Sequence, residues 1–159
     1  MTMRTANDSG APESARVDIS REGARVTTQT DIPHRRVIAT EHAPAAIGPY
    51  SQAIVAGSLL FTAGQIPLDP VTMKLVDGDI TAQAERVMAN LGAVLLEAGS
   101  SFEHVIKTTC FLADLGDFPA FNAVYGTFFT GDAPARSTVQ VAKLPLGSLV
   151  EVECISLIP

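Results

Sequence analysis

The run of residues 149–157 constrains the fold most, because it alternates strictly and carries apolar residues on both of its sides. Leu149, Ile155 and Leu157 share one side with two glutamates. The other side consists of Val150, Val152, Cys154 and Ser156. Successive side chains of a strand point to opposite faces of its sheet, so both faces of this sheet need covering. We expect helices on one face and a further subunit on the other.

Two segments with helical periodicity supply the helices. Residues 81–98 place seven apolar residues on one face: Ala84, Val87, Met88, Leu91, Val94, Leu95 and Ala98. Thr81 is the expected N-cap, and Gly99 is expected to end the helix. A second helix is predicted from Asp117, the expected N-cap, with Pro119 in its first turn, to Gly131.

The remaining periodic segments predict strands at residues 36–40, 51–55, 58–63, 105–113, 136–142 and 149–157. Glycine at position 57 indicates a tight hairpin whose turn is either Ala56-Gly57 or Gly57-Ser58. Residues 65–79 form a long loop. This order of strands and helices predicts an α+β fold, a mixed sheet with two helices packed on one face.

Composition divides the chain in two. Residues 1–35 lack hydrophobic periodicity and are expected to be a mobile extension, and residues 36–159 form the single domain. Residues 1–40 carry a net charge of +1 and residues 41–159 one of −7. So acidic a body argues against a nucleic-acid surface. With no apolar run of the roughly 18 residues that cross a membrane, we expect a soluble protein of the cytoplasm, whose two cysteines, Cys110 and Cys154, are buried reduced thiols.

Local motifs alone leave the chemistry open. The three histidines lack metal-ligand spacing and no phosphate-binding loop or nucleophile motif occurs, so we expect neither metal nor cofactor. Apart from Arg86, Arg136 is the only arginine after residue 40. It fits either a solvated surface charge or a clamp for a carboxylate. Glu151 and Glu153, about 7 Å apart on one strand face, are equally good acids by this criterion.

Five segments together resemble the RidA/YjgF family of reactive-intermediate deaminases. They are residues 43–52 (APAAIGPYSQ), 62–67 (TAGQIP), 107–109 (KTT), 122–125 (NAVY) and 134–151, which contains PARS and ends in VE. The resemblance implies a chorismate-mutase-like fold and a homotrimer whose sheets form a central barrel. It places three sites at the subunit interfaces.

The resemblance also implies a function, the cofactor-free hydrolysis of 2-iminobutanoate and 2-iminopropanoate to 2-keto acids and ammonia. Arg136 would hold the substrate carboxylate, Glu151 rather than Glu153 would orient or activate water, and Tyr50 would shape the pocket. Further substrate-binding positions would be Gly64, Asn122, Thr138 and Ala63.

Two positions depart from the family pattern, and other functions stay open. Ala63 stands where well-studied deaminases have serine, and Thr138 where many have cysteine. A binding module for 2-keto acids without turnover is one alternative, and a pathway-specific enamine or aminomuconate deaminase is another. Some relatives are described as ribonucleases, but the charge of −7 on the body makes RNA a poor partner.

Overall fold

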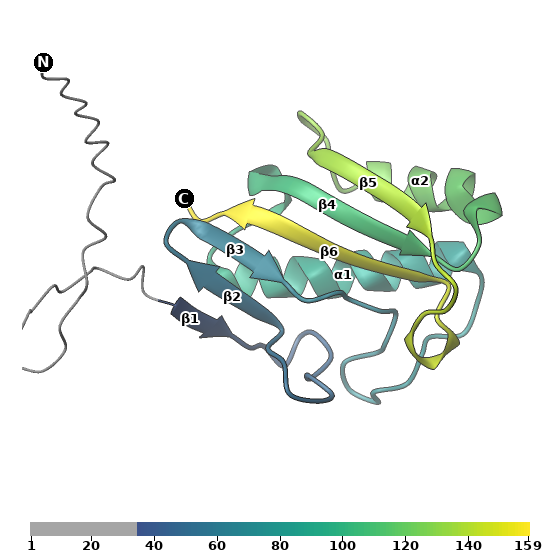
Figure 1. Cartoon of the computed structure of the whole chain (residues 1–159), viewed down its shortest axis with the longest axis horizontal. Coiled ribbons are helices and arrows are strands. Elements are labelled where there is room, and N and C mark those ends of the chain that lie inside the picture. The colour runs from purple at the N-terminus through teal and green to yellow at the C-terminus, as the bar shows by residue number, and fades with distance from the viewer. Residues whose placement is uncertain (1–34) are drawn as a thin grey trace, which may run out of the picture. The chain divides into compact units, whose positions relative to one another are not determined.

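The computed structural model describes residues 35–159, so the predicted extension of residues 1–35 lies outside the described part except for its last residue. The strands are β1 (Arg35–Ile38), β2 (Ala53–Ala56), β3 (Leu59–Thr62), β4 (Val105–Leu112), β5 (Ala135–Gln140) and β6 (Val150–Leu157). The helices are α1 (Ile80–Ala98) and α2 (Phe118–Gly126), as drawn in Figure 1. Neither helix, nor any other in the described residues, is long and apolar enough to cross a membrane.

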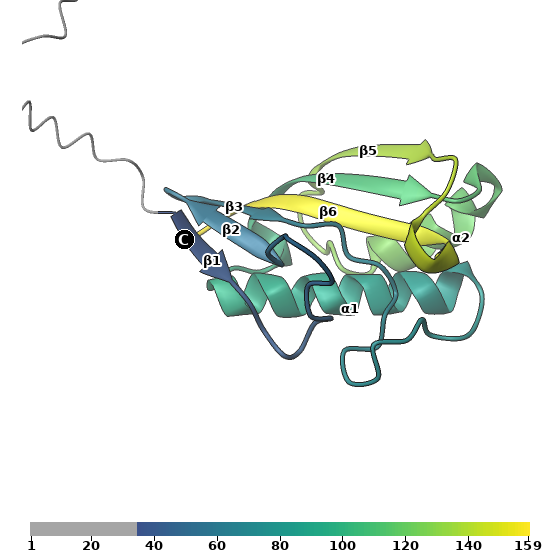
Figure 2. The same ribbon diagram turned by 60° about the horizontal axis from the view of Figure 1, so that its bottom comes forward.

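The six strands form one mixed sheet in the order β1-β2-β3-β6-β4-β5. Every neighbouring pair is antiparallel except β4 and β5, which run parallel. Both helices cover the same face of the sheet, as Figure 2 shows from the side. The predicted α+β fold is therefore confirmed.

β6 lies between β3 and β4, and its alternation has the predicted consequence. Val150, Val152 and Ser156 are fully buried, and Cys154 nearly so, on the face that α1 covers. The face that the helices leave uncovered, called the outer face below, carries large apolar side chains that are exposed or only partly buried in the single chain. Among them are Val37, Ile54, Leu59, Phe61, Phe111, Val139, Ile155 and Leu157.

The apolar stripe of α1 is confirmed, but its predicted cap is wrong. Asp79, not Thr81, is the N-cap, and its carboxylate accepts hydrogen bonds from the backbone N–H groups of Thr81 and Ala82 at 3.0 and 3.2 Å. A carboxylate satisfies two free donors of the first turn and also favours the positive end of the helix dipole. Gly99 ends the helix as predicted, with a left-handed backbone (φ 84°).

α2 is shorter than predicted. It ends at Gly126, because the Thr127 hydroxyl donates to the Val124 carbonyl (2.7 Å) and the backbone N–H of Phe128 bonds to Tyr125. The chain then turns so that the rings of Phe128 and Phe129 pack against that of Phe102. Asp117 occupies the predicted N-cap position, but its side chain makes no capping hydrogen bond.

The hairpin between β2 and β3 settles the open choice of turn. Ala56 pairs with Leu59, so the turn residues are Gly57 and Ser58. Gly57 has φ +62°, the backbone conformation that favours glycine. Cys110 and Cys154 are free and buried, as predicted, and burial raises the pKa of the two thiols to about 11 and about 12.

Asp79→Ala tests the revised start of α1. The change removes two capping hydrogen bonds and is expected to lower the free energy of unfolding by about 1 kcal/mol, measured by urea denaturation. Asp77→Ala is the matched control, because Asp77 is exposed and makes no side-chain hydrogen bond among the described residues. Equal losses in the two variants would contradict the role of Asp79.

Candidate functional site

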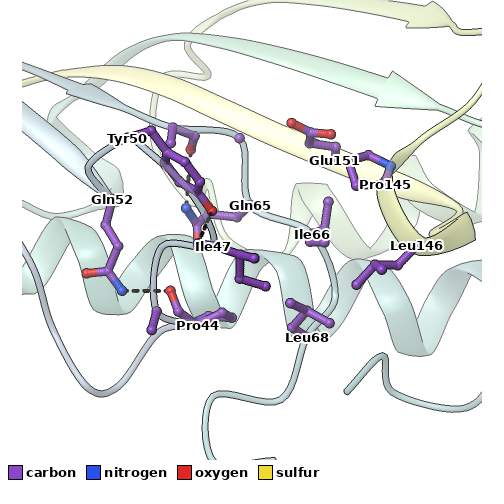
Figure 3. A pocket seen from close by; sticks show the side chains of 13 residues that line it. Pro44, Ile47, Tyr50, Gln52, Gln65, Ile66, Leu68, Pro145, Leu146 and Glu151 are labelled. Carbon is purple, nitrogen blue, oxygen red and sulfur yellow. Dashed lines mark hydrogen bonds between the residues drawn. The ribbon is translucent and has the colours of Figure 1, made fainter. Parts of the chain in front are cut away.

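A cavity of about 440 Å³ opens where three loops meet: the segment before β2, the segment after β3 and the β5–β6 connection (Figure 3). Four of the residues singled out from the sequence line it, namely Tyr50, Ala63, Gly64 and Glu151. Most of the remaining lining is apolar. Concave, largely apolar cavities with a few polar groups are the usual form of small-molecule sites.

Glu151 is the acid of this cavity. It projects from the outer face of β6, and burial, followed by the nearby charge of Glu153, raises the pKa of its carboxyl above the ordinary 4.5. Glu153 instead lines a separate hollow of about 140 Å³ beside Lys107. The structure thus separates two acids that the strand pattern left equivalent.

Gly64 lies directly against Glu151. A Cβ atom at position 64 would lie 2.7 Å from Glu151 Cδ and closer still to its carboxylate oxygen. Only glycine leaves the carboxylate in its observed place, and backbone groups at this point can approach a ligand closely.

A buried glutamine holds the wall that carries Tyr50. Gln52 is 4% exposed, and its oxygen accepts from the backbone N–H of Thr40 at 2.6 Å. Its NH₂ group lies 2.8–3.2 Å from the carbonyl oxygens of Thr40, Ala43 and Pro44. This one amide therefore fixes the start of a loop that has no strand partner.

Tyr50 lies further along the same loop. Its hydroxyl accepts a hydrogen bond from the backbone N–H of Ile47 at 3.2 Å, and the side chain is 51% exposed. The hydroxyl can still donate to a ligand. Tyr50 is thus a half-exposed residue of the loop before β2, and its side chain lines the cavity.

The opposite wall is held by another buried amide. Asn90 of α1 is fully buried and donates to the carbonyl oxygens of Ile66 and Leu68 at 3.2 and 2.9 Å, and both of these residues line the cavity. The backbone of Gln65 pairs with Val152 of β6 in both directions (2.8 and 3.1 Å). Core and cavity wall are therefore tied together.

The other three candidate residues form a second cluster on β5 and α2. Arg136 donates to the Asn122 side-chain oxygen at 2.8 Å. Its guanidinium carbon lies 4.5 Å from the ring centroid of Tyr125 and 5.4 Å from that of Phe118. Stacking and one hydrogen bond aim the guanidinium while leaving donors for a carboxylate. Arg136 is thus not a freely solvated surface charge.

Thr138 lies on the same face of β5 as Arg136, two residues on. Its hydroxyl oxygen is buried and has no hydrogen-bond partner among the described residues. Its pairing partner in β4 is Cys110.

Within one chain, Arg136 and Glu151 lie on opposite faces of the sheet. Arg136 pairs with Thr108 of β4, which in turn pairs with Cys154 of β6. Residues directly opposite each other share a face, and Cys154 points toward the helices. Glu151 alternates with it and points the other way. In a single chain, the pocket with the Glu151 carboxylate and the cluster with the Arg136 guanidinium therefore lie on different faces of the sheet.

Three residues of these clusters escaped the sequence analysis in this role. Tyr125 belongs to the core, where it is 5% exposed, yet its ring also lies against the Arg136 guanidinium, and its hydroxyl is hydrogen-bonded to that of Thr108 at 2.8 Å. Its spacing of three residues from Asn122 on one helix was the available signal. Gln52 and Asn90 gave none, because their partners are backbone groups that lie 8 to 24 residues away in the chain. In residues 35–159, no three His, Cys, Asp or Glu side chains are grouped to hold a metal.

Comparison with known proteins gives consistent matches. The family model described as Endoribonuclease L-PSP matches residues 40–158. Protein DfrA of Myxococcus xanthus is 58% identical over 124 residues, 77% of this chain and 95% of that protein. The 2-iminobutanoate/2-iminopropanoate deaminase of Mus musculus is 48% identical over 122 residues, 77% of this chain and 90% of that protein. The crystal structure of E. coli TdcF with bound serine matches with a TM-score of 0.74 and 42% identity, covering 77% of this chain and 98% of that one.

Gln52→Glu tests the amide that holds the Tyr50 loop. At neutral pH a carboxylate would face the carbonyl oxygens of Thr40, Ala43 and Pro44 without a donor. We expect the free energy of unfolding to fall by about 1–3 kcal/mol. The folded state would raise the pKa of the new carboxyl, so the loss is present at neutral pH and shrinks as pH falls through that pKa and the acid regains a donor.

Gln140→Glu is the matched control. Gln140 uses only its oxygen, as acceptor of the Leu115 backbone N–H at 2.9 Å, and a carboxylate keeps that bond. We expect a change within about 0.5 kcal/mol. The free energy of unfolding of both variants is measured by denaturation at neutral and acidic pH. If Gln52→Glu is as stable as the control at neutral pH, the Gln52 amide does not hold the loop.

Proposed function

This chain belongs to the RidA/YjgF family, and from that premise we propose that it is a deaminase that hydrolyses 2-imino acids to 2-keto acids and ammonia. The observation that carries the proposal is the desolvated carboxylate of Glu151 in a cavity bordered by Gly64 and Tyr50. A carboxylate with a raised pKa is suited to accept a proton from water and to return it later. 2-Iminobutanoate and 2-iminopropanoate are the proposed substrates, as the name of the mouse relative suggests.

The proposed site forms between subunits of a homotrimer. Substrate binding needs a cation for the carboxylate, and the cavity lining contains no lysine or arginine from the described residues. Arg136 lies on β5, an edge strand, where it can reach a neighbouring chain. The apolar outer face gives a reason for association, since large exposed apolar surfaces mark interaction sites. Arg136 of the partner subunit would then complete the pocket that contains Glu151.

In the proposed mechanism, the guanidinium of Arg136 binds the substrate carboxylate through two parallel hydrogen bonds and places the imine carbon near Glu151. Glu151 takes a proton from water as the oxygen attacks that carbon and passes it to the imine nitrogen, which gives a neutral carbinolamine. Glu151 then takes the hydroxyl proton of the carbinolamine and gives it to the nitrogen as the C–N bond breaks, and the keto acid and ammonia leave. Backbone groups near Gly64 and Thr138 would contact the ligand.

The bound serine named for the E. coli TdcF structure supports a ligand of this size and type, with a carboxylate beside a nitrogen-bearing carbon. Ala63, however, supplies no hydroxyl to the cavity. This favours one second candidate, a module that binds 2-keto acids without turnover. Binding of 2-ketobutyrate with no change in imine lifetime would select it. A pathway-specific enamine or aminomuconate deaminase would instead turn over its own substrate faster than these imines.

RNA cleavage is not proposed, despite the endoribonuclease description of the family model. Residues 41–159 carry a net charge of −7, and phosphate backbones bind to clustered lysine and arginine. The carboxylate of Glu151 in the cavity lining would repel a phosphate further.

Arg136→Ala tests the proposed carboxylate clamp. We expect a loss of about a hundredfold in kcat/KM in a coupled dehydratase assay that follows imine decay, because the substrate is no longer positioned. Arg136→Lys should recover only part of it, since an ammonium lacks the planar fork.

Arg86→Ala is the control, because Arg86 is the other arginine of residues 41–159 and lies on α1 outside the cavity lining. It should retain wild-type activity. Full activity in Arg136→Ala would sink the mechanism.

The pH dependence tests Glu151 as the base. Its raised pKa means that the active carboxylate form is lost, as pH falls, at a higher pH than for an ordinary glutamate. Glu153→Gln removes the smaller cause of the shift, so the acidic limb of the kcat/KM profile should move to lower pH.

Glu97→Gln, on the exposed part of α1, changes the net charge equally and should leave the limb in place. If the acidic limb stays in place in Glu153→Gln, or moves as far in Glu97→Gln, the assignment of Glu151 as the base is ruled out.

A further inference from the structure

Three large apolar side chains that are more than half exposed gather at the mouth of the Glu151 cavity. They are Ile47 (63% exposed), Tyr50 (51%) and Leu146 (65%). Two come from the loop before β2 and the third from the β5–β6 connection (Figure 3). Apolar side chains exposed together at a concave site indicate contact with a ligand.

The backbone of Leu146 adopts a strained conformation at this mouth. Its φ is +56°, a left-handed conformation that costs energy for a residue with a side chain, and Gly147 follows with φ +77°. The buried Ser148 donates from its hydroxyl and its backbone N–H to the Pro145 carbonyl, at 3.0 and 3.1 Å. The side chain of Leu144 is buried before the turn. Such a conformation persists where its surroundings fix it, often at ligand sites.

The side chain of Leu146 extends from the turn toward Ile66 and Leu68 (Figure 3). Together with Ile47 these residues make one end of the cavity an apolar surface. Glu151 is the only acidic or basic side chain that the described residues contribute to the lining. A substrate side chain that carried a carboxylate would meet both an apolar wall and a like charge.

Resting on the proposed deaminase function, we infer that Leu146 is a specificity-determining residue, against which, with Ile47, the side chain of the bound imino acid packs. The site then favours 2-imino acids with branched aliphatic side chains over those with a methyl or a carboxylate-bearing side chain. The reacting groups stay the same, and Leu146 changes only which substrates reach them.

The test compares three imines, produced in place from leucine, alanine and glutamate by an L-amino-acid oxidase and trapped with semicarbazide. For the wild-type protein, kcat/KM should be about tenfold higher with the leucine imine than with the glutamate imine. Leu146→Ala should lower kcat/KM about tenfold for the leucine imine and less than about twofold for the alanine imine. Leu146→Lys should shift the preference toward the glutamate imine.

Leu115→Ala is the matched control, because Leu115 is also an exposed leucine in a short 3₁₀ turn but lies outside the cavity lining. It should leave all three rates unchanged, and melting temperatures verify the fold of each variant. An unchanged ratio of leucine to alanine imine rates in Leu146→Ala, or the same change in Leu115→Ala, overturns the inference while the deaminase function stands.

If the wild-type protein accelerates none of the imines, the proposed function fails and calorimetry decides the inference. Loss in Leu146→Ala of about tenfold in affinity for the 2-oxo acid of leucine, relative to that of alanine, supports the role of Leu146. Equal affinities of the two proteins for both acids overturn it.

Discussion

The rest of the structure depends on the two-sided central strand β6. Val150, Val152 and Cys154 join the core under α1, which fixes the strand firmly, and the residues between them are thereby fixed on the outer face. Glu151 is one of these residues, so the position of the candidate base is set by the packing of its neighbours. The same core holds the cavity walls, because Val152 pairs with the backbone of Gln65. A functional group carried on a rigid strand is placed more accurately than one carried on a loop.

The loops around the cavity are held in a different way, by buried amide side chains. Gln52 bonds to four backbone groups, and Asn90 reaches from α1 to two carbonyl oxygens of the opposite wall. An amide combines a donor group with an acceptor and carries no charge, so it can satisfy loop backbone in the interior at little electrostatic cost. Glu151, the one charged residue among the described residues that line the cavity, then acts in surroundings where a nearby dipole or cation has a strong effect.

Features that depend on residues close together in the sequence were predictable from it. The stripe of α1 and the alternation of β6 were confirmed, since periodicity alone decides which residues are buried. Helix ends depend on which nearby side chain makes the capping hydrogen bond, and they were predicted less well. Asp79, not the predicted Thr81, caps α1, and α2 ends before the predicted residue because Thr127 bonds to the last turn. Gln52 and Asn90 lay beyond prediction, because a buried amide with distant backbone partners has no local pattern. The four residues of the cavity and the Arg136 cluster were selected by resemblance, and their chemical roles remain proposals.

Arg136 and Glu151 lie on opposite faces of the sheet because β5 pairs in parallel with β4 in the observed register. The sequence pattern does not predict this pairing. The proposed catalysis, which uses both residues, would therefore take Arg136 from a second chain, and the apolar outer face would give that chain a surface to bind. In the proposed trimer, covering the outer face and completing the site become one event. An isolated chain would then expose its apolar outer face to water and would have an incomplete site. Selection for stability and selection for activity would therefore act on the same interface.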